Sequence, residues 1–367
     1  MAEKETALQK QRREILERTI AEIQKKQPDN IIGKYSEIGA NVDVEVISTG
    51  SLAVDAAIGG GFAKGRLINL VGHTSSGKTT LALTAIAEEQ KKNPDANILY
   101  IDAEFALDPR YAAALGVDLN NIVLSQPSSG EEGYEAAEMF IASGVADIVV
   151  IDSIAAMLPK AMLEKDYNAE AQPGVFARLT TSAIGRINRL ASLNNTTVIL
   201  INQWKPVVRI NQYQAVPGAL GGWYQPGGGQ LAFFCSQIIE VKKSGEIKEG
   251  SEIKSNVITM TCKKNKIAPP HRIADFVITY GVGLDEIQEL ISLGVAMKEI
   301  KISGSFYTFP NLKNAPEKPV QGRVKVGELL KENEALRSEL RKALKKQIEG
   351  AQEIIIEKET SSTPTEG

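Results

Sequence analysis

A phosphate-binding pattern stands at the end of an apolar run early in the chain. The run 67–71 leads directly into Gly72, and the pattern closes with Gly77 and Lys78 before two threonines. Glycines let the backbone approach phosphate oxygens, the lysine reaches the β and γ phosphates, and a hydroxyl binds Mg²⁺. The pattern therefore predicts a site for a nucleoside triphosphate and Mg²⁺. Its predicted nucleotide-binding residues are Gly72, Ser75, Ser76, Gly77, Lys78, Thr79 and Thr80.

A glycine-rich surface loop is the alternative interpretation of this pattern. Residues 79–87 read as a helix, whose N-terminal N–H groups and dipole would face the phosphates. The order of strand, loop and helix therefore favours the nucleotide site.

Polar side chains end three later apolar runs. Asp152 follows the run 148–151, and an acidic residue there commonly holds Mg²⁺ directly or through water. Glu104 lies just beyond the run 98–101, where its carboxylate could orient the water that attacks the γ phosphate; a helix cap or a surface carboxylate is the alternative role. Gln203 precedes a long loop, so its amide could sense the γ phosphate and order that loop.

The elements that must position these residues alternate between short apolar runs and amphipathic segments. This alternation predicts parallel strands joined by crossover helices, and nearly continuous apolar strands suit a sheet covered on both faces. The predicted fold class is α/β, with a mostly parallel sheet flanked by helices. The expected strands are 67–71, 98–101, 122–124, 148–151 and 198–201, and the expected helices are 78–91, one from 109, 130–143 and 174–193.

Three regions stand outside this alternation. A charged helix from about residue 4 to 26 could pack on its own domain or on a neighbouring subunit, and periodicity leaves both open. The segments 237–241 and 256–261 suggest a hairpin joined by a charged turn at 243–254. A smaller helical unit begins after about Gly281.

Composition places the 367-residue chain among ordinary globular proteins, with 43% hydrophobic and 24% charged residues. The net charge of −3 argues against blanket nucleic-acid affinity driven by charge and requires any DNA site to be a local basic surface. Cys235 and Cys262 show no metal-ligand spacing. No apolar run approaches the roughly 18 to 20 residues that cross a bilayer, so we expect a cytoplasmic protein without membrane contact.

The long region 204–230 mixes basic and aromatic residues, among them Trp204, Lys205, Arg209 and Trp223. Such a mixture suits phosphate contacts and base stacking. An active-site lid is the alternative interpretation.

Several stretches together resemble the RecA family of bacterial recombinases, including relatives carried by bacteriophages. The likeness runs from about residue 8 to 310. The distinctive stretches are 47–52 (ISTGSL), 75–81 (SSGKTTL), 101–104 (IDAE), 106–109 (ALDP), 125–127 (SQP), 201–203 (INQ) and 264–268 (KNKIA).

The resemblance implies roles for individual residues. Lys78 and Thr79 would bind ATP and Mg²⁺, Asp152 would support the metal site, and Glu104 would activate the hydrolytic water. Gln203 would link the γ phosphate to the second DNA-binding loop, so Glu104, Lys78 and Gln203 form the predicted catalytic set. Adenine contacts are implied for Asp108, Tyr111 and Tyr280, and contacts with a neighbouring subunit's ATP for Lys264 and Lys266.

The chain also departs from the family pattern. His73 and Thr74 stand where many members have Pro-Glu, and the first DNA loop at 164–173 differs strongly. The second DNA loop, which is the long region 204–230, is several residues longer than usual. The C-terminal helix differs from the acidic tail of many relatives. The candidates for DNA contact are Arg178, Lys205, Arg209, Gly227 and Gly228.

The resemblance predicts four parts of the chain and one overall function. The parts are an N-terminal oligomerisation arm at 1–35, a RecA-like ATPase and DNA-binding core at 36–281, a small C-terminal α+β domain at 282–350, and a partly disordered tail at 351–367. The function is that of a DNA-dependent ATPase that forms helical homopolymers on single-stranded DNA, pairs it with homologous double-stranded DNA and exchanges strands. Loader proteins and a repressor are candidate partners. The alternatives are a ring-forming motor or helicase and a nucleotide-gated, non-catalytic DNA-binding protein.

Overall fold

The computed structural model describes residues 7–27, 32–34, 44–164, 174–207, 222–249 and 251–361. The chain divides into two compact units, Met1–Val44 and Glu45–Gly367. The first unit contains helix α1 (Ala7–Lys26), which ends with Lys25 and Lys26 in its last turn, where positive charge favours the helix dipole. Within this unit the side chains of Leu8, Ile15 and Leu16 are exposed.

A mostly parallel sheet forms the centre of the second unit. Its strands in chain order are β3 (Leu67–Gly72), β4 (Ile98–Asp102), β5 (Ile122–Ser125), β6 (Ile148–Asp152), β7 (Thr197–Gln203), β10 (Gln237–Glu249), β11 (Glu252–Asn265), β12 (Ile273–Thr279) and β13 (Gly283–Leu284). Within the described residues the order across this sheet is β13-β12-β11-β10-β3-β7-β6-β4-β5. Strands β10 to β5 in that order are parallel, and β11, β12 and β13 each run antiparallel to their neighbour. The predicted α/β class is confirmed.

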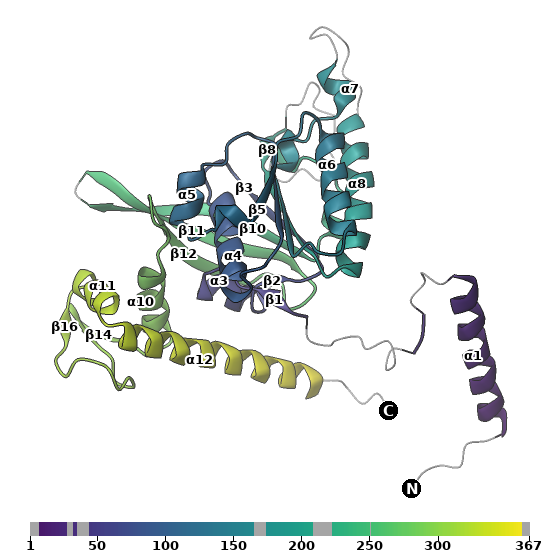
Figure 1. Cartoon of the computed structure of the whole chain (residues 1–367). Helices are drawn as coiled ribbons and strands as arrows, with labels where there is room; N and C mark the ends of the chain where they lie inside the picture. The colour runs from purple at the N-terminus through teal and green to yellow at the C-terminus, as the bar shows by residue number, and fades with distance from the viewer. Residues whose placement is uncertain are drawn as a thin grey trace. The chain divides into compact units, whose positions relative to one another are not determined.

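Helices cover both faces of this sheet (Figure 1). On one face α3 (Leu52–Ile58) and α4 (Lys78–Lys92) pack on alternate strand residues such as Ile68 and Leu70. On the other face α6 (Gly130–Ala142) and α8 (Val175–Leu193) pack on the intervening residues, such as Leu67 and Val71. The period-2 alternation of a strand explains how one apolar run serves both layers.

Shorter elements lie in the connections between the main strands and helices. The helical ones are α5 (Pro109–Ala114), α7 (Lys160–Leu163), α9 (Leu231–Phe234) and the 3₁₀ turns η1 (Leu119–Asn121) and η2 (Ile154–Ala156). The paired strands are β1 (Val46–Ile47) with β2 (Phe62–Ala63), and β8 (Lys205–Pro206) with β9 (Trp223–Tyr224).

The hairpin of β10 and β11 is longer than the sequence suggested, and it projects beyond the parallel strands (Figure 1). The predicted charged turn at 243–254 is wrong, because most of these residues are paired strand. Two register shifts interrupt this outer part of the ladder, and the ion pair between Lys243 and Glu246 spans 2.7 Å. Charged side chains therefore occupy the solvated outer part of this hairpin, and composition alone does not distinguish such a hairpin from a turn.

The C-terminal part combines a small antiparallel sheet with three helices. Its strands are β14 (Lys301–Ser303), β15 (Phe306–Thr308) and β16 (Val320–Gln321), and its helices are α10 (Glu286–Ala296), α11 (Arg323–Glu332) and α12 (Glu334–Ser361). Helices α11 and α12 are separated at Asn333, whose side chain accepts a hydrogen bond from the Leu336 N–H. The backbone of α12 is helical to Ser361, so part of the predicted tail lies in this helix.

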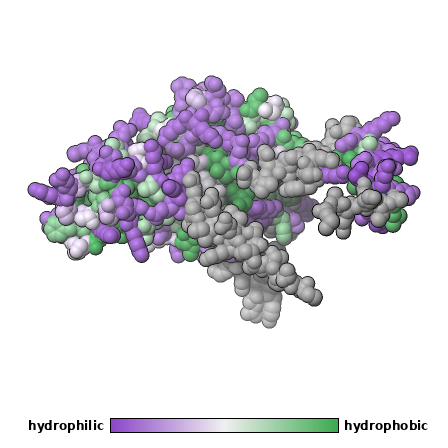
Figure 2. Space-filling view, turned by 90° about the horizontal axis from the view of Figure 1, so that it is seen from below, coloured by the Kyte–Doolittle hydropathy of each residue, from purple (hydrophilic) through white to green (hydrophobic). Residues whose placement is uncertain are grey.

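The surface seen from below is mainly hydrophilic over its described residues, with smaller hydrophobic patches between (Figure 2). No helix in the described ranges is long and apolar enough to span a membrane.

Candidate functional site

The phosphate loop joins β3 to α4 through two residues with positive φ. Ser75 has φ of 58° and Gly77, at the N-terminus of α4, has φ of 91°. Gly72 is required by a close approach: a Cβ on it would lie 2.1 Å from the carbonyl oxygen of Val241 on β10. Small residues at these positions therefore allow the tight turn that joins β3 to α4.

Lys78 is buried and points back into this loop. Its Nζ donates to the carbonyl oxygens of Gly72 (3.2 Å) and His73 (2.7 Å) and to Ser76 Oγ (3.4 Å). Burial lowers the pKa of Lys78 to about 8, although the nearby carboxylates of Asp152 and Glu104 partly oppose that shift. A lysine in this position is still mainly protonated at neutral pH and can attract phosphate.

Asp152 and Thr79 form the candidate metal site. Thr79 Oγ1 donates to Asp152 Oδ2 at 2.9 Å, and the buried hydroxyl of Tyr100 donates to the same oxygen at 2.8 Å. Burial raises the pKa of Asp152, and the two hydrogen bonds partly oppose it. A hydroxyl and a carboxylate are the hard oxygen ligands that suit Mg²⁺, which takes few protein ligands beside phosphate and water. Sequence reasoning missed Tyr100, whose strand-buried hydroxyl reads as ordinary core.

Glu104, Ser153 and Gln203 meet at the carboxyl edge of the sheet. Strand pairing sets Asp102 opposite Asp152, and the backbone N–H of Ala103 bonds to the Asp152 carbonyl at 2.8 Å. Glu104 is exposed there, and its Oε1 accepts hydrogen bonds from Ser153 Oγ and from Gln203 Nε2 (2.7 Å). The predicted water-orienting carboxylate and the predicted γ-phosphate sensor are therefore in direct contact.

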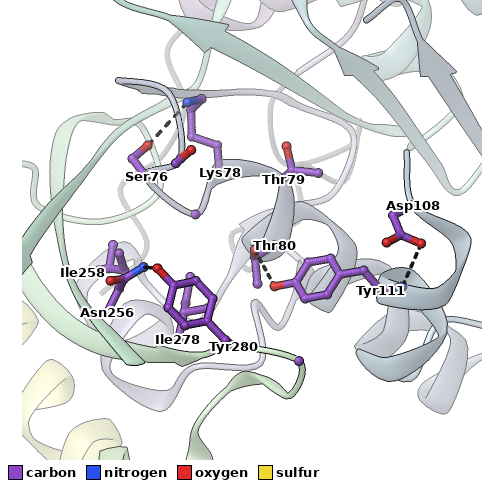
Figure 3. Close-up of a pocket in the computed structure, with 13 residues that line it drawn as sticks. Ser76, Lys78, Thr79, Thr80, Asp108, Tyr111, Asn256, Ile258, Ile278 and Tyr280 are labelled. Carbon is purple, nitrogen blue, oxygen red and sulfur yellow. Dashed lines mark hydrogen bonds between the residues drawn. The ribbon is translucent and has the colours of Figure 1, made fainter. Parts of the chain in front are cut away.

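A cavity of about 520 Å³ opens beside the phosphate loop. Tyr111 from α5 and Tyr280 beyond β12 flank Thr80 from opposite sides (Figure 3). Tyr111 and Thr80 share a hydrogen bond of 2.9 Å between their hydroxyls. Asp108 lines the cavity and caps α5, accepting from the backbone N–H groups of Arg110 (2.8 Å) and Tyr111 (3.3 Å).

Sequence reasoning missed the wall that the hairpin and β12 contribute to this cavity. Asn256, Ile258 and Ile278 line it, and Asn256 Nδ2 donates to the Tyr280 hydroxyl at 2.9 Å (Figure 3). Asn256 Oδ1 is buried without a hydrogen-bond partner in the part of the chain that the structure describes. An apolar slot with an unpaired acceptor suits a base that can donate an amino hydrogen. The one sequence signal was a polar residue beginning an apolar strand.

Lys264 and Lys266 do not join this cavity. Asn265 lies between the two lysines and pairs with Gln237. Gln237 in turn pairs with Ile68, near the start of β3. The phosphate loop follows the other end of β3. Lys264 Nζ donates to the carbonyl oxygens of Ala232 (2.7 Å) and Phe233 (3.2 Å). The two lysines therefore lie at the opposite edge of the sheet from the nucleotide site of their own chain.

The candidate DNA residues are only partly brought together. Lys205, Gly227 and Gly228 line a second cavity of about 520 Å³, together with Gly174 at the start of α8. Arg178 is exposed on the first turns of α8. Arg209 and most of the predicted first DNA loop lie outside the described residues.

Comparison with known proteins identifies the family. The family model for the RecA N-terminal domain matches residues 14–285. Protein RecA of Francisella tularensis subsp. novicida (strain U112) is 42% identical over 330 residues, which cover 90% of this chain and 88% of that protein. The chain belongs to the RecA family. Protein RecA of Francisella tularensis subsp. tularensis (strain WY96-3418) matches with the same identity and coverage.

A solved structure, described as the crystal structure of the RadB recombinase, is also similar. Its TM-score is 0.47 at 24% sequence identity, and the match covers 65% of this chain and 98% of that one.

Membership of the RecA family confirms the predicted activity class. The chain is a DNA-dependent ATPase of DNA recombination and repair, and ATP is the nucleotide of its family. DNA binding and filament formation are general to the RecA family. The cavity, the phosphate loop and the carboxylates of Glu104 and Asp152 together form the candidate ATP site of this chain.

Proposed function

We propose that the chain polymerises as a helical filament on single-stranded DNA, pairs the bound strand with homologous duplex and exchanges strands under the control of ATP. The observation that carries this proposal is the 2.7 Å hydrogen bond between Gln203 and Glu104. It joins a carboxylate suited to hydrolysis to the residue that leads into the second DNA loop. Nucleotide chemistry and DNA binding can then bias each other, because each would favour one arrangement of the same contact.

Each site residue has a role in the proposed ATP hydrolysis. The phosphate loop and Lys78 would bind the β and γ phosphates, while Asp108, Tyr111 and Tyr280 would hold the adenine end. Glu104 would orient the attacking water and accept its proton. Thr79 and Asp152 would hold Mg²⁺, which offsets the charge of the phosphates.

The remaining parts would serve DNA binding and assembly. Lys205, Gly227, Gly228 and Arg178, with Arg209 from the segment between β8 and β9, are proposed to contact DNA mainly at phosphates, so binding should be salt-sensitive and tolerant of sequence. The arm at 1–35 would dock on an adjacent subunit. The core at 36–281 would carry the ATPase and DNA-binding residues, and residues 282–350 would form the small C-terminal domain. We expect the filament to act in the cytoplasm, with loader proteins and a repressor as candidate partners.

The direct test is phosphate release by purified protein with and without single-stranded DNA, with electron microscopy of the same samples. We expect strong stimulation by DNA and helical filaments. Glu104→Gln should lower stimulated release by about 100-fold or more while ATP still binds, because it removes the proton acceptor. Lys78→Ala should abolish nucleotide binding as well.

Glu135 is an exposed carboxylate on α6, so Glu135→Gln is the matched control and should retain activity. Rings in place of filaments would favour a motor, and filaments without turnover would favour a nucleotide-gated binding protein. Wild-type stimulation in Glu104→Gln would contradict its assigned role.

A further inference from the structure

An aromatic contact joins the phosphate loop to the base of the second DNA loop. The rings of His73 and Trp223 have centroids 4.6 Å apart and planes 85° apart. Edge-to-face pairs of this kind are favourable beyond the area they bury. His73 is also one of the two residues at which the phosphate loop departs from the pattern of many family members.

Trp223 belongs to the short ribbon that closes the base of this DNA loop. In the ribbon of β8 and β9, Trp223 pairs with Pro206 and Tyr224 pairs with Lys205. The N–H of Val207 bonds to the carbonyl of Gly222 at 2.7 Å. The ribbon therefore joins the two ends of segment 208–221, and Lys205 on it is a candidate DNA contact.

Lys78 uses all its donors within the phosphate loop. An ammonium group has three N–H donors, and those of Lys78 reach Gly72 O, His73 O and Ser76 Oγ. A phosphate oxygen can bond to Lys78 only if at least one of these bonds is released or shared. Phosphate binding must therefore change the bonding of the loop itself.

The two carbonyls that Lys78 contacts belong to residues that also hold the ribbon. The Gly72 carbonyl accepts the N–H of Trp204 at 3.2 Å, directly before β8. The His73 ring meets Trp223 on β9. Both strands of the ribbon thus contact the two residues whose carbonyl oxygens Lys78 binds.

We propose that His73 and Trp223 are positioning residues that transmit phosphate binding at Lys78 to the second DNA loop. This contact differs from the one that the Gln203 side chain makes with Glu104, although the Gln203 backbone pairs with Gly72 in the sheet. The inference rests on the proposed function for the role of that loop. It adds a second connection, through a residue that many family members do not carry.

The first test needs no DNA. The chain has two tryptophans, so Trp204→Phe leaves Trp223 as the sole indole reporter. Saturating this protein with Mg²⁺ and a slowly hydrolysed ATP analogue should change the Trp223 emission. Adding His73→Ala should remove most of that change at saturation, when any difference in nucleotide affinity no longer matters. An unchanged emission response in the His73→Ala protein would overturn the proposal.

The second test measures coupling between nucleotide and DNA. The Kd for a fluorescent oligo(dT) strand is measured by anisotropy with and without the analogue, and the ratio is the coupling factor. His73→Ala and Trp223→Ala should each lower this factor by about fivefold or more, and the double variant should lower it little further. Trp223→Phe keeps an aromatic edge partner and should retain most of the coupling. Single variants with the wild-type factor, or effects that multiply, would overturn the proposal.

These outcomes separate the inference from the proposed function. Gln203→Ala should also lower the coupling factor, and adding His73→Ala should lower it further, because the two variants remove different side-chain contacts. A wild-type factor of one would overturn the nucleotide control in the proposed function and, with it, the role of His73 in DNA binding. A large wild-type factor that survives His73→Ala would overturn this inference alone. Circular dichroism and cooperative thermal unfolding check the fold of each variant.

Discussion

The candidate nucleotide site requires glycine at position 72, because there is no room for a side chain there. Its backbone passes so close to β10 that a Cβ would meet Val241 O at 2.1 Å and Ser76 Oγ at 2.6 Å. Its φ is not positive, so packing rather than left-handed backbone geometry requires glycine there. The phosphate pattern demands glycine for the approach of phosphate, and the sheet demands it for the approach of a neighbouring strand.

We therefore predict that Gly72→Ala damages both fold and site. Overpacking at this position should lower the free energy of unfolding by about 1–3 kcal/mol. The displaced loop should weaken binding of a fluorescent ATP analogue by at least about tenfold, a change measured by titration. Gly229→Ala is the control, because a Cβ there meets no atom within 4 Å and its φ is not positive. Wild-type nucleotide affinity in Gly72→Ala would contradict this steric account.

At the scale of elements, a buried carboxylate joins α10 to the start of α3. Glu289 accepts hydrogen bonds from Ser51 Oγ and from the N–H groups of Leu52 (3.3 Å) and Ala53 (3.1 Å). A carboxylate at a helix N-terminus satisfies N–H groups that have no partner within the helix. Burial nevertheless raises the pKa of Glu289 to about 7, and these hydrogen bonds only partly oppose it. Burial also raises the pKa of nearby Asp55, to about 6.

The stability of this junction should depend on pH. The ordinary pKa of Glu289 is 4.5, so between pH 4.5 and about 7 the folded protein holds a proton that the unfolded chain releases. Its contribution is full below pH 4.5 and is lost as pH rises through 7. We expect the free energy of unfolding to fall by about 1 kcal/mol between pH 6 and pH 8 from this group.

Urea denaturation at pH 6 and pH 8 measures this effect. Glu289→Gln cannot ionise and should remove most of the fall over that range, since Asp55 contributes mainly at lower pH. The exposed Glu317→Gln should keep the wild-type dependence. An identical pH dependence in Glu289→Gln would show that this carboxyl is not the titrating group.

At the scale of the whole molecule, the fold separates two sets of candidate ATP contacts. Lys264 and Lys266 flank a residue paired near the start of the sheet's central strands, while the phosphate loop and Glu104 lie beyond their ends. One chain cannot bring both sets to one nucleotide. A head-to-tail assembly can, because it sets one edge of a subunit against the other edge of the next.

Mixing two inactive proteins tests this arrangement. Glu104→Gln and the double variant Lys264→Ala with Lys266→Ala should each show little DNA-stimulated phosphate release alone. In a 1:1 mixture, the double variant supplies an unchanged Glu104 and the Glu104→Gln protein supplies both unchanged lysines. An interface that combines these two contributions has all the predicted residues. Random co-assembly at such heterologous interfaces should restore roughly a quarter of the wild-type rate. A mixture no more active than the two separate proteins would indicate that the lysines do not act across subunits.

Local chemistry made much of this molecule predictable. The strands that precede the phosphate pattern and Asp152 were confirmed, as was the helix after the pattern, because glycine, lysine and apolar period act over a few neighbouring residues. The ends of parallel strands share one edge, so Glu104, Asp152 and Gln203 could be expected to meet there.

Contacts between distant segments were decided by the tertiary structure. Asn256 reaches the nucleotide cavity because the hairpin extends past β3, and Glu289 reaches α3 from a position 238 residues away from Ser51. The meeting of His73 with Trp223 likewise depends on how a ribbon sits over the phosphate loop. Strand order, register and the packing of loops place these partners, and no periodic or local pattern in the chain predicts which distant segments meet.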